Sequence, residues 1–343
     1  MTVAEVLEVV DPGILTTIQD AGRPGLGALG VPRAGACDPT SLAIANLLLG
    51  NRPDDPALEC TLSGPELLVL RDGVVGLAGA DLGAVTLPSG RRLATGAAHA
   101  VAAGERLSVR GGGVGGEAGA EAGCRAYLAV PGGFEVSRVL GSASTSLVGG
   151  FGGLDGRPLR AGDRLRAATA TSVDHRLARN RWPIGLALPG SGGTVAVLPG
   201  PAATGERGRA ALDLLTGTTW RVAAASDRRG LRLEGPVVEL DVPADGPSHG
   251  VPTGTIQVTP SGQPLVLLPD AGPTGGYPVL AVVATASLSI VGQARPGGTV
   301  RFRLVAPDVA RAEERARRDT LAAGGARLAA TDPWDDLPDH AGA

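Results

Sequence analysis

The sequence predicts a mostly β protein, and three observations indicate this fold class. Many short runs rich in Val, Leu, Ile and Thr are bounded by Gly, Pro, Asp or Ser, as is typical of strands joined by turns. Gly occurs 54 times and Pro 27 times in 343 residues, which supplies those turns. Aromatic residues make up only 2% of the chain, so the core must be built from aliphatic side chains. Strands this short and numerous favour sandwiches or barrels.

The strands are expected in a regular series along the chain. The runs that predict them are 66–70, 74–78, 85–87, 107–110, 126–130, 194–198, 219–223, 237–240, 255–258, 265–268, 280–285 and 299–304.

Three segments predict helices. Asp38 and Pro39 precede the apolar run TSLAIANLLL and Gly50, which reads as an N-cap, a proline at the first helical position and a glycine stop. Residues 204–217 repeat this arrangement. Residues 308–323 are rich in Arg and Glu and predict a solvated helix that leads into a disordered tail.

An internal repeat predicts two related β domains. LSGPELLVL (62–70) resembles LEGPVVEL (233–240), TLPSGRRLA (86–94) resembles VTPSGQPLV (258–266), and LRAGDRLR (159–166) resembles ARPGGTVRF (294–302). The third pair is offset less than the others, so the first copy carries an insertion, for which the Gly-rich loop 111–123 is the candidate. We expect a first domain at 1–185, a second at 190–305, and a C-terminal helix and tail at 306–343.

Composition excludes several classes of function. The net charge is -3, so no nucleic-acid partner is indicated. All 31 basic residues are Arg, and without Lys the chain can carry neither covalent biotin nor a P-loop lysine.

The three Cys and four His are scattered, so we expect no metal site. The N-terminus lacks a basic signal region and no apolar stretch is long enough to span a membrane, so a cytoplasmic location is expected.

The segment 14–39 holds the first candidate site residues. Arg23 is suited to clamp a carboxylate or phosphate, and Asp20 or Asp38 to act as a base or metal ligand. The structural alternative is that Asp20 and Arg23 pair locally, and that Asp38 only caps the helix.

Segment 139–156 is a glycine array, VLGSASTSLVGGFGGLDG, in which backbone N–H groups can approach an anion. Gly149, Gly150, Gly152 and Gly153 are the candidates, and a plain turn is the alternative.

A third constellation spans 249–278. We expect a substrate site at one barrel rim, built from Gln257, Gln263, Asp270, Thr274, Gly275, Gly276 and Tyr277. The alternative is that Gln257 and Gln263 only satisfy the backbone of the loops. Arg228 in ASDRRG is a further anion-binding candidate, with a surface ion pair as the alternative.

Several motifs in order carry a family resemblance. They are the whole segment 14–51, ALECTLSGP, RAYLAVPGGF, GSASTSLVGGFGG, GLRLEGP, GTIQVTPSGQP and TGGYP. The chain resembles the family of the 5-oxoprolinase C subunit, which is also described as allophanate hydrolase subunit 2 or as the biotin-dependent carboxyltransferase A/B family.

The resemblance implies two cyclophilin-like β-barrel domains and a role as one subunit of a hydrolase. The C subunit would act with B-type and A-type subunits in the ATP-dependent opening of 5-oxoproline to glutamate, with ATP and Mg²⁺ bound by the complex. The alternative is a carboxyltransferase component that uses carboxybiotin supplied in trans for urea or amide carboxylation. A third reading, a non-catalytic regulatory or binding subunit, follows from departures from the family pattern, several of which lose a charged or hydrogen-bonding group. These positions are Ala34, Cys37, Ala143, Ser146, Val148, Ala202, His249 and Val279.

Overall fold

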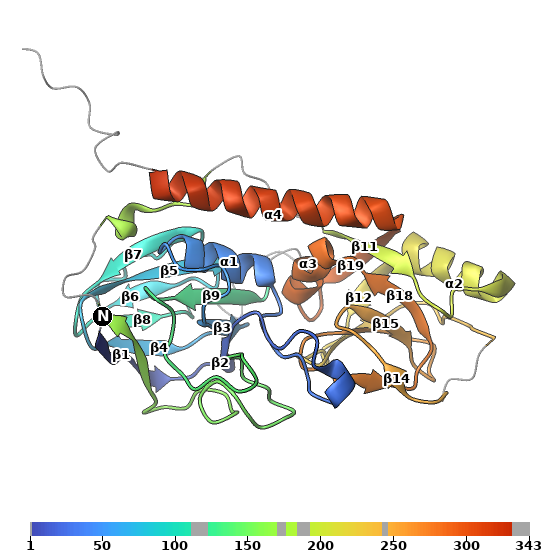
Figure 1. Ribbon diagram of the computed structural model, residues 1–343, viewed down its shortest axis with the longest axis horizontal. Coiled ribbons are helices and arrows are strands. Elements are labelled where there is room, and N and C mark those ends of the chain that lie inside the picture. The colour runs from blue at the N-terminus through green and yellow to red at the C-terminus, as the bar shows by residue number, and fades with distance from the viewer. Residues whose placement is uncertain (1, 111–122, 170–175, 184–192, 242–245, 331–343) are drawn as a thin grey trace, which may run out of the picture.

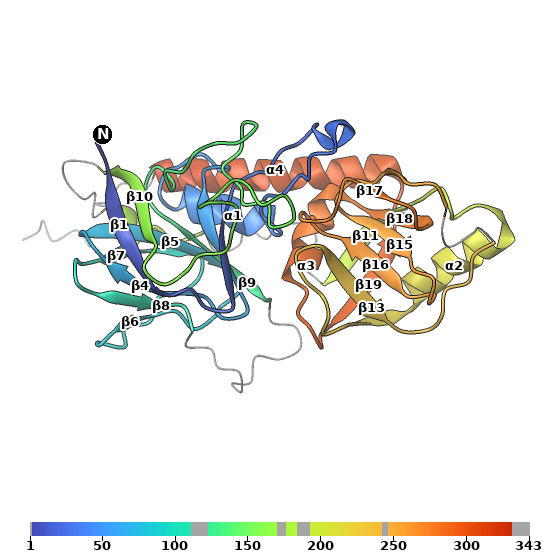
Figure 2. The same ribbon diagram turned by 90° about the horizontal axis from the view of Figure 1, so that it is seen from below.

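A computed structural model describes residues 2–110, 123–169, 176–183, 193–241 and 246–330. Two β units lie side by side, and one long helix runs across both of them (Figures 1 and 2). The mostly β fold class is confirmed, with strands from residue 2 to residue 304. Within the described residues, no helix is both long and apolar enough to cross a membrane.

The first unit, called here the two-sheet unit, holds two five-stranded sheets. Aliphatic side chains from both sheets form one buried core, which includes Leu7, Ile18, Leu58, Leu67 and Leu107. The strands of one sheet are, in spatial order, β10 (Arg164–Thr169), β1 (Thr2–Asp11), β4 (Glu66–Val69), β8 (Arg106–Ser108) and β6 (Val85–Leu87). Those of the other are β2 (Leu15–Gln19), β3 (Ala57–Thr61), β9 (Arg125–Ala129), β5 (Gly73–Gly79) and β7 (Ala97–Val101).

The second unit is a closed barrel. Strands β11 and β19 pair in parallel and close it, whereas its other neighbouring strands pair antiparallel. Trp220 is fully buried in the core of the barrel, and its indole N–H donates to the Leu215 carbonyl at 2.9 Å. The order is β11 (Thr194–Pro199), β18 (Val279–Val283), β15 (Thr255–Val258), β16 (Pro264–Leu267), β13 (Gly230–Glu234), β12 (Thr219–Val222) and β19 (Thr299–Leu304). A small ladder of β14 (His249–Gly250) and β17 (Thr274–Gly275) lies beside it.

Two helices join the units. Helix α1 (Pro39–Leu47) lies on the second sheet, where its apolar residues pack on Tyr127 and Ala129, and α4 (Pro307–Ala330) covers α1 through Leu321. Helix α2 (Gly205–Gly217) packs on the barrel, and α3 (Leu288–Gln293) lies between the barrel and α1. Short 3-10 turns occur at η1 (Gly27–Leu29), η2 (Leu177–Arg179) and η3 (Thr285–Ser287).

The three predicted helices are confirmed, but α4 continues to Ala330, beyond the end that was expected near residue 323. Gly324 packs against the ring of Trp182, where a Cβ atom would overlap the ring, so the glycine allows close packing. The predicted strand at 237–240 is wrong. This segment is an extended loop in which the Val238 N–H donates to the Gly262 carbonyl at 2.9 Å, and the neighbouring strand is β13.

The repeat is visible in part. The turns before β10 and β19 correspond, as do the turns after β6 and β15, whereas the counterpart of β4 is the 237–240 loop. The domain boundaries at 185 and 190 stay a prediction, because residues 184–192 lie outside the described residues. Residues 111–122 of the candidate insertion also lie outside the described residues, as does the expected tail at 331–343.

Candidate functional site

The loop from β2 to α1 carries the first candidate residues to the boundary between the two units. A cavity of about 80 Å³ lies there, and we call it the junction cavity. The loop contributes Asp20, Arg33 and Cys37 to its lining, and the barrel side contributes Thr253. The rest of the wall is apolar, made of alanine, proline and leucine side chains.

The backbone of this loop is folded tightly on itself. Gly22 has a φ of +76°, and a Cβ atom there would lie 2.6 Å from the Ala34 carbonyl oxygen, so only glycine fits. Ala34 also has a positive φ, of 51°, and its N–H donates to the Pro269 carbonyl of the barrel at 3.0 Å. The loop is therefore fixed to the barrel beside the cavity.

Asp20 is buried, and its carboxylate binds the glycine array. Oδ1 accepts from the Gly22 N–H at 2.8 Å and from the Ser142 and Ser144 hydroxyls, and Oδ2 accepts from the Ala143 N–H at 2.7 Å. The exposed Arg138 guanidinium lies 3.8 Å from Oδ2. With this many donors the carboxylate has little capacity left to accept a proton from a substrate.

Arg23 binds the same segment from another side. Its Nε donates to the Val139 carbonyl at 2.9 Å, and its Nη2 donates to the Ser142 and Ser144 carbonyls at 3.2 and 2.8 Å. The guanidinium carbon lies 4.8 Å from the centre of the Phe151 ring. The Nη1 atom is buried and has no hydrogen-bond partner among the described residues. Burial lowers the pKa of Arg23, and the nearby Asp20 charge opposes that shift.

Asp38 is the N-cap of α1. Its Oδ1 accepts from the backbone N–H groups of Thr40 and Ser41 at 3.0 and 2.9 Å. Its Oδ2 accepts from the Ser41 hydroxyl at 2.5 Å and from Gln293 Nε2 at 2.7 Å, which links α1 to α3. Both oxygens therefore have structural partners, as the capping alternative expected.

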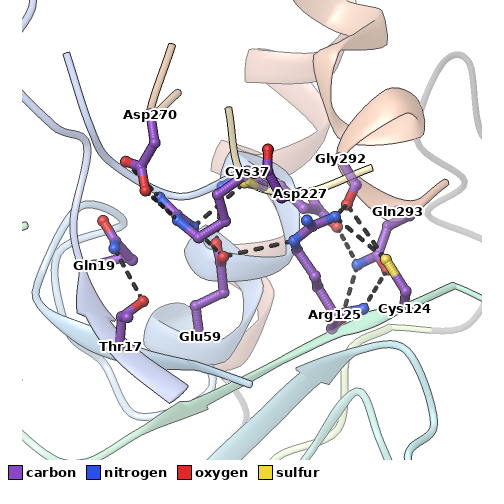
Figure 3. Close-up of polar contacts among 12 residues, drawn as sticks. Thr17, Gln19, Cys37, Glu59, Cys124, Arg125, Asp227, Asp270, Gly292 and Gln293 are labelled. Carbon is purple, nitrogen blue, oxygen red and sulfur yellow. Dashed lines mark hydrogen bonds and ion pairs between the residues drawn. The ribbon is translucent and has the colours of Figure 1, made fainter. Parts of the chain in front are cut away.

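A buried ionic cluster lies next to the cavity, and we call its members Glu59, Arg125, Arg228 and Asp270 the junction network. Figure 3 labels Glu59, Arg125 and Asp270 of this network. Arg228 Nε and Nη2 contact the two carboxylate oxygens of Asp270 at 2.9 and 3.3 Å. Arg228 Nη1 also contacts Glu59 Oε1, and Nη2 donates to the Gly35 carbonyl at 2.8 Å. The surface ion pair considered for Arg228 is wrong, because this side chain is 2% exposed.

Glu59 lies between Asp270 and Arg125 (Figure 3). Arg125 Nε is 3.6 Å from Glu59 Oε1, and its Nη1 donates to the Gly292 carbonyl of α3. Glu59 Oε2 accepts from the Tyr127 hydroxyl at 2.6 Å and from the Cys37 N–H at 2.8 Å. Two cations and two carboxylates thus balance one another inside the protein.

Burial and the charges of the junction network shift the pKa values of Glu59, Asp270 and Cys37. Burial raises the pKa of Glu59, but the charges of Arg228 and Arg125 lower it by more, so the pKa falls below its usual value. For Asp270 burial dominates over Arg228, and its pKa rises. Burial raises the pKa of the Cys37 thiol to about 12. At neutral pH Cys37 is therefore a neutral thiol and a poor nucleophile.

The remaining barrel candidates lie in two places. Gln257 is buried under the 274–277 turn, where its Nε2 contacts the Tyr277 carbonyl at 3.4 Å, and Thr274 and Gly275 form β17. Gln263 lies at the other end of β16 from Asp270 and binds the Gly235 backbone. None of the predicted residues 257, 263 and 274–277 lines the junction cavity.

The four candidate glycines of the array also lie in two kinds of surroundings. Gly152 is buried against Arg23, where a Cβ atom would lie 2.6 Å from Nη2, and Gly153 faces Thr145. Gly149 and Gly150 are exposed. The structure thus unites Asp20 and Arg23 with the array, and Arg228 with Asp270, while the roles assigned to all these residues stay predictions.

Sequence reasoning did not single out Glu59, Arg125, Arg33 or Thr253. A usable signal was present for the first two, because Glu59 lies inside an apolar strand and Arg125 begins one, and charges at such places are rarely buried without a partner. Among the described residues, no group of three or more His, Cys, Asp or Glu side chains is arranged to hold a metal ion.

Comparison with known proteins gives a consistent result. The family model described as "Carboxyltransferase domain, subdomain A and B" matches residues 29–304. The C subunit of 5-oxoprolinase from Escherichia coli K12 is 36% identical over 299 residues, which cover 86% of this chain and 90% of the relative. That of Haemophilus influenzae is 35% identical, covering 87% of this chain and 91% of the relative. The crystal structure of K. lactis urea amidolyase matches with a TM-score of 0.80 and 29% identity over 93% of this chain, which spans only 20% of that enzyme.

Proposed function

The chain belongs to the family of carboxyltransferase domains, subdomains A and B, and on this premise we propose that it serves as the C subunit of a 5-oxoprolinase. It would act with B-type and A-type subunits in the ATP-dependent conversion of 5-oxoproline to glutamate. We assign this complex to the cytoplasm, because the three cysteines are free thiols and disulfides are rare in that compartment.

One observation carries the proposal. The chain is homologous to the 5-oxoprolinase C subunit over about nine tenths of the relative's length, whereas it matches one fifth of urea amidolyase. Since the relative is named as one subunit of an enzyme, a heteromeric complex is expected for this chain too.

The chemistry of the junction cavity fits a binding role for this chain. The cavity is small and mostly apolar, with few polar groups, which suits a small organic molecule. Asp20 is engaged by protein donors and Cys37 is a neutral thiol, so neither is prepared for covalent or general-base catalysis. We infer that this chain holds and orients a substrate while the partner proteins complete the active site.

ATP does not fit the junction cavity. About 80 Å³ corresponds to roughly six water positions at about 10–15 Å³ each, far less than the several hundred Å³ of a pocket for a larger ligand. In the proposed complex, ATP and Mg²⁺ therefore bind outside this cavity.

Carboxyl transfer is the second candidate, favoured by the structural match to urea amidolyase and by the description of the family. Biotin would have to come from another protein, because this chain has no lysine for its attachment.

The deciding experiment is reconstitution with the B-type and A-type subunits from the same source. We expect glutamate to form from 5-oxoproline only when ATP and all three proteins are present. Carboxylation of urea by added carboxybiotin, without glutamate formation, would replace the proposal by the second candidate. Unchanged glutamate formation without this chain would indicate a regulatory role.

A further inference from the structure

We propose that Arg33 binds the carboxylate of a small cyclic acid in the junction cavity, and that this contact separates such acids from neutral amides and urea. The inference rests on the proposed function for the identity of the acid. It rests on the cavity for the chemistry.

The cavity has room for one small ring. Its volume corresponds to roughly six water positions, and a five-membered ring with one or two substituents needs a space of this order. The walls include Pro39, Leu268, Pro269 and Leu288, which offer apolar contact to the methylene groups of such a ring. The walls therefore favour a compact and partly apolar ligand.

The two charged residues that line the cavity, Asp20 and Arg33, differ in whether their side chains already have partners. The Asp20 carboxylate accepts hydrogen bonds from the Gly22 and Ala143 N–H groups and from two serine hydroxyls. Arg33 is exposed, and in the part of the chain that the structure describes its guanidinium makes no hydrogen bond or ion pair. Of the residues that line the cavity, Arg33 thus supplies the cation that is free to bind an anion.

The two charges also define an orientation. A ligand carboxylate is repelled by Asp20 and attracted by Arg33, so it lies at the Arg33 side. The uncharged amide edge of the ring then lies toward the remaining lining residues with polar side chains, Cys37 and Thr253. 5-Oxoproline has both a carboxylate and a ring amide, whereas urea has no carboxylate.

The peptide unit that joins Arg33 to Ala34 is held by hydrogen bonds at both its carbonyl and its N–H. Its carbonyl accepts from the Arg23 N–H at 2.8 Å, and the next residue, Ala34, donates to Pro269 of the barrel at 3.0 Å. A rigid backbone lowers the entropy that the site loses when a ligand binds.

The test is calorimetric titration of the full chain, alone and in complex with its B-type partner, without ATP. The probes are 5-oxoproline, 2-pyrrolidinone, which lacks the carboxylate, and urea. We expect 5-oxoproline to bind most tightly. Its affinity should fall about tenfold to a hundredfold in Arg33→Ala, the range for a hydrogen bond to a charged group, and by less in Arg33→Lys.

Arg71→Ala is the matched control, because Arg71 is an exposed arginine outside the junction cavity, and we expect it to bind like the wild type. Binding of 2-pyrrolidinone should be weak and equal in all variants. Equal affinity of wild type and Arg33→Ala for 5-oxoproline would overturn the inference, as would the absence of 5-oxoproline binding by both the chain and the complex.

The inference and the proposed function can fail separately. If the reconstituted enzyme forms glutamate and Arg33→Ala leaves KM unchanged, the proposed function stands and the role of Arg33 is wrong. If no glutamate forms, but 5-oxoproline still binds in an Arg33-dependent way, the binding site stands and the proposed function is wrong.

Discussion

Arg228 of the barrel forms an ion pair with Glu59 of the two-sheet unit, and both side chains are almost fully buried. The same guanidinium binds Asp270 of the barrel, so one cation joins a carboxylate from each unit. Such a cluster has a directional geometry that apolar packing lacks. We therefore infer that the junction network fixes how the two units meet around the junction cavity.

Replacing Arg228 by Met should strongly destabilise the protein, because Glu59 and Asp270 would keep buried charges with one cation fewer. Removal of one partner of a buried ion pair costs about 3–5 kcal/mol, measured here as the free energy of unfolding in urea. Arg221→Ala is the control, since Arg221 pairs with Glu234 on the barrel surface, where such pairs contribute about 0–1 kcal/mol. Similar losses in the two variants would contradict the prediction.

Glu59 should make the stability depend on pH in the acid range. Its pKa in the folded protein is lower than the usual value of 4.5, because the effect of burial is outweighed by the charges of Arg228 and Arg125. The contribution of Glu59 to stability is thus fully present above about pH 4.5 and is lost as the pH falls through the lower folded pKa. The difference in unfolding free energy between wild type and Glu59→Gln should be constant above that pH and shrink below it.

Asp270 provides the control for this pH effect. Its pKa is raised by burial, so the folded protein takes up a proton there before the unfolded chain does, which favours the folded state as the pH falls. Asp270→Asn should therefore lose stability more steeply than the wild type on acidification. A parallel pH profile for wild type, Glu59→Gln and Asp270→Asn would refute both assignments.

Local patterns in the sequence predict much of the fold. The cap at Asp38, with Pro39 after it and Gly50 beyond the helix, depends on residues close in the chain, and α1 is confirmed there. The mostly β class follows from short aliphatic runs separated by turns. The strand expected at 237–240 failed because Gly235 and Pro236 end β13, and the valines that follow form a loop.

The site depends on contacts that no local pattern contains. Glu59 and Arg228 are separated by 169 positions, and only the meeting of the two units brings them together. The motif around Arg23 indicated a polar turn, but not that its partners are carbonyls of the 139–144 segment. Sequence reasoning therefore found Asp20, Arg23, Arg228 and Asp270 as residues of interest without finding which of them act together.

The cysteines should be unreactive in the folded protein. Burial raises the pKa of Cys37 and of Cys60 to about 12, and it also raises that of Cys124. At pH 8 we expect no reaction of the native chain with Ellman's reagent, and reaction of all three thiols after unfolding in guanidinium chloride. Rapid labelling of Cys37 in the native protein would contradict its assignment as a neutral thiol and reopen a nucleophilic role.

Arg23→Ala distinguishes an anion clamp from a structural anchor. Three backbone carbonyls would lose the Arg23 donor. Those of Val139 and Ser142 keep a backbone N–H partner, whereas the Ser144 carbonyl keeps none among the described residues. A buried group left unsatisfied costs about 1–3 kcal/mol, so we expect a clear loss of unfolding free energy. Arg138→Ala is the control, because Arg138 is half exposed and makes only long contacts, to Asp20 at 3.8 Å and to the Gly141 carbonyl at 3.4 Å. Unchanged stability of Arg23→Ala together with weakened ligand binding would favour the anion clamp.

Gly152 and Gly150 offer a matched pair that tests what the glycine array does. Both have a positive φ, 74° and 66°, so replacement by alanine strains both backbones to a similar extent, about 1–2 kcal/mol. At Gly152 a Cβ atom would also overlap the Ser144 carbonyl oxygen and lie 2.6 Å from Arg23 Nη2, whereas at Gly150 nothing lies within 4 Å. If the array serves to pack the segment onto Arg23, Gly152→Ala should lower the unfolding free energy well beyond Gly150→Ala. Equal losses in urea unfolding, accompanied by weaker binding of inorganic phosphate in Gly150→Ala, would instead support the exposed glycines as an anion site.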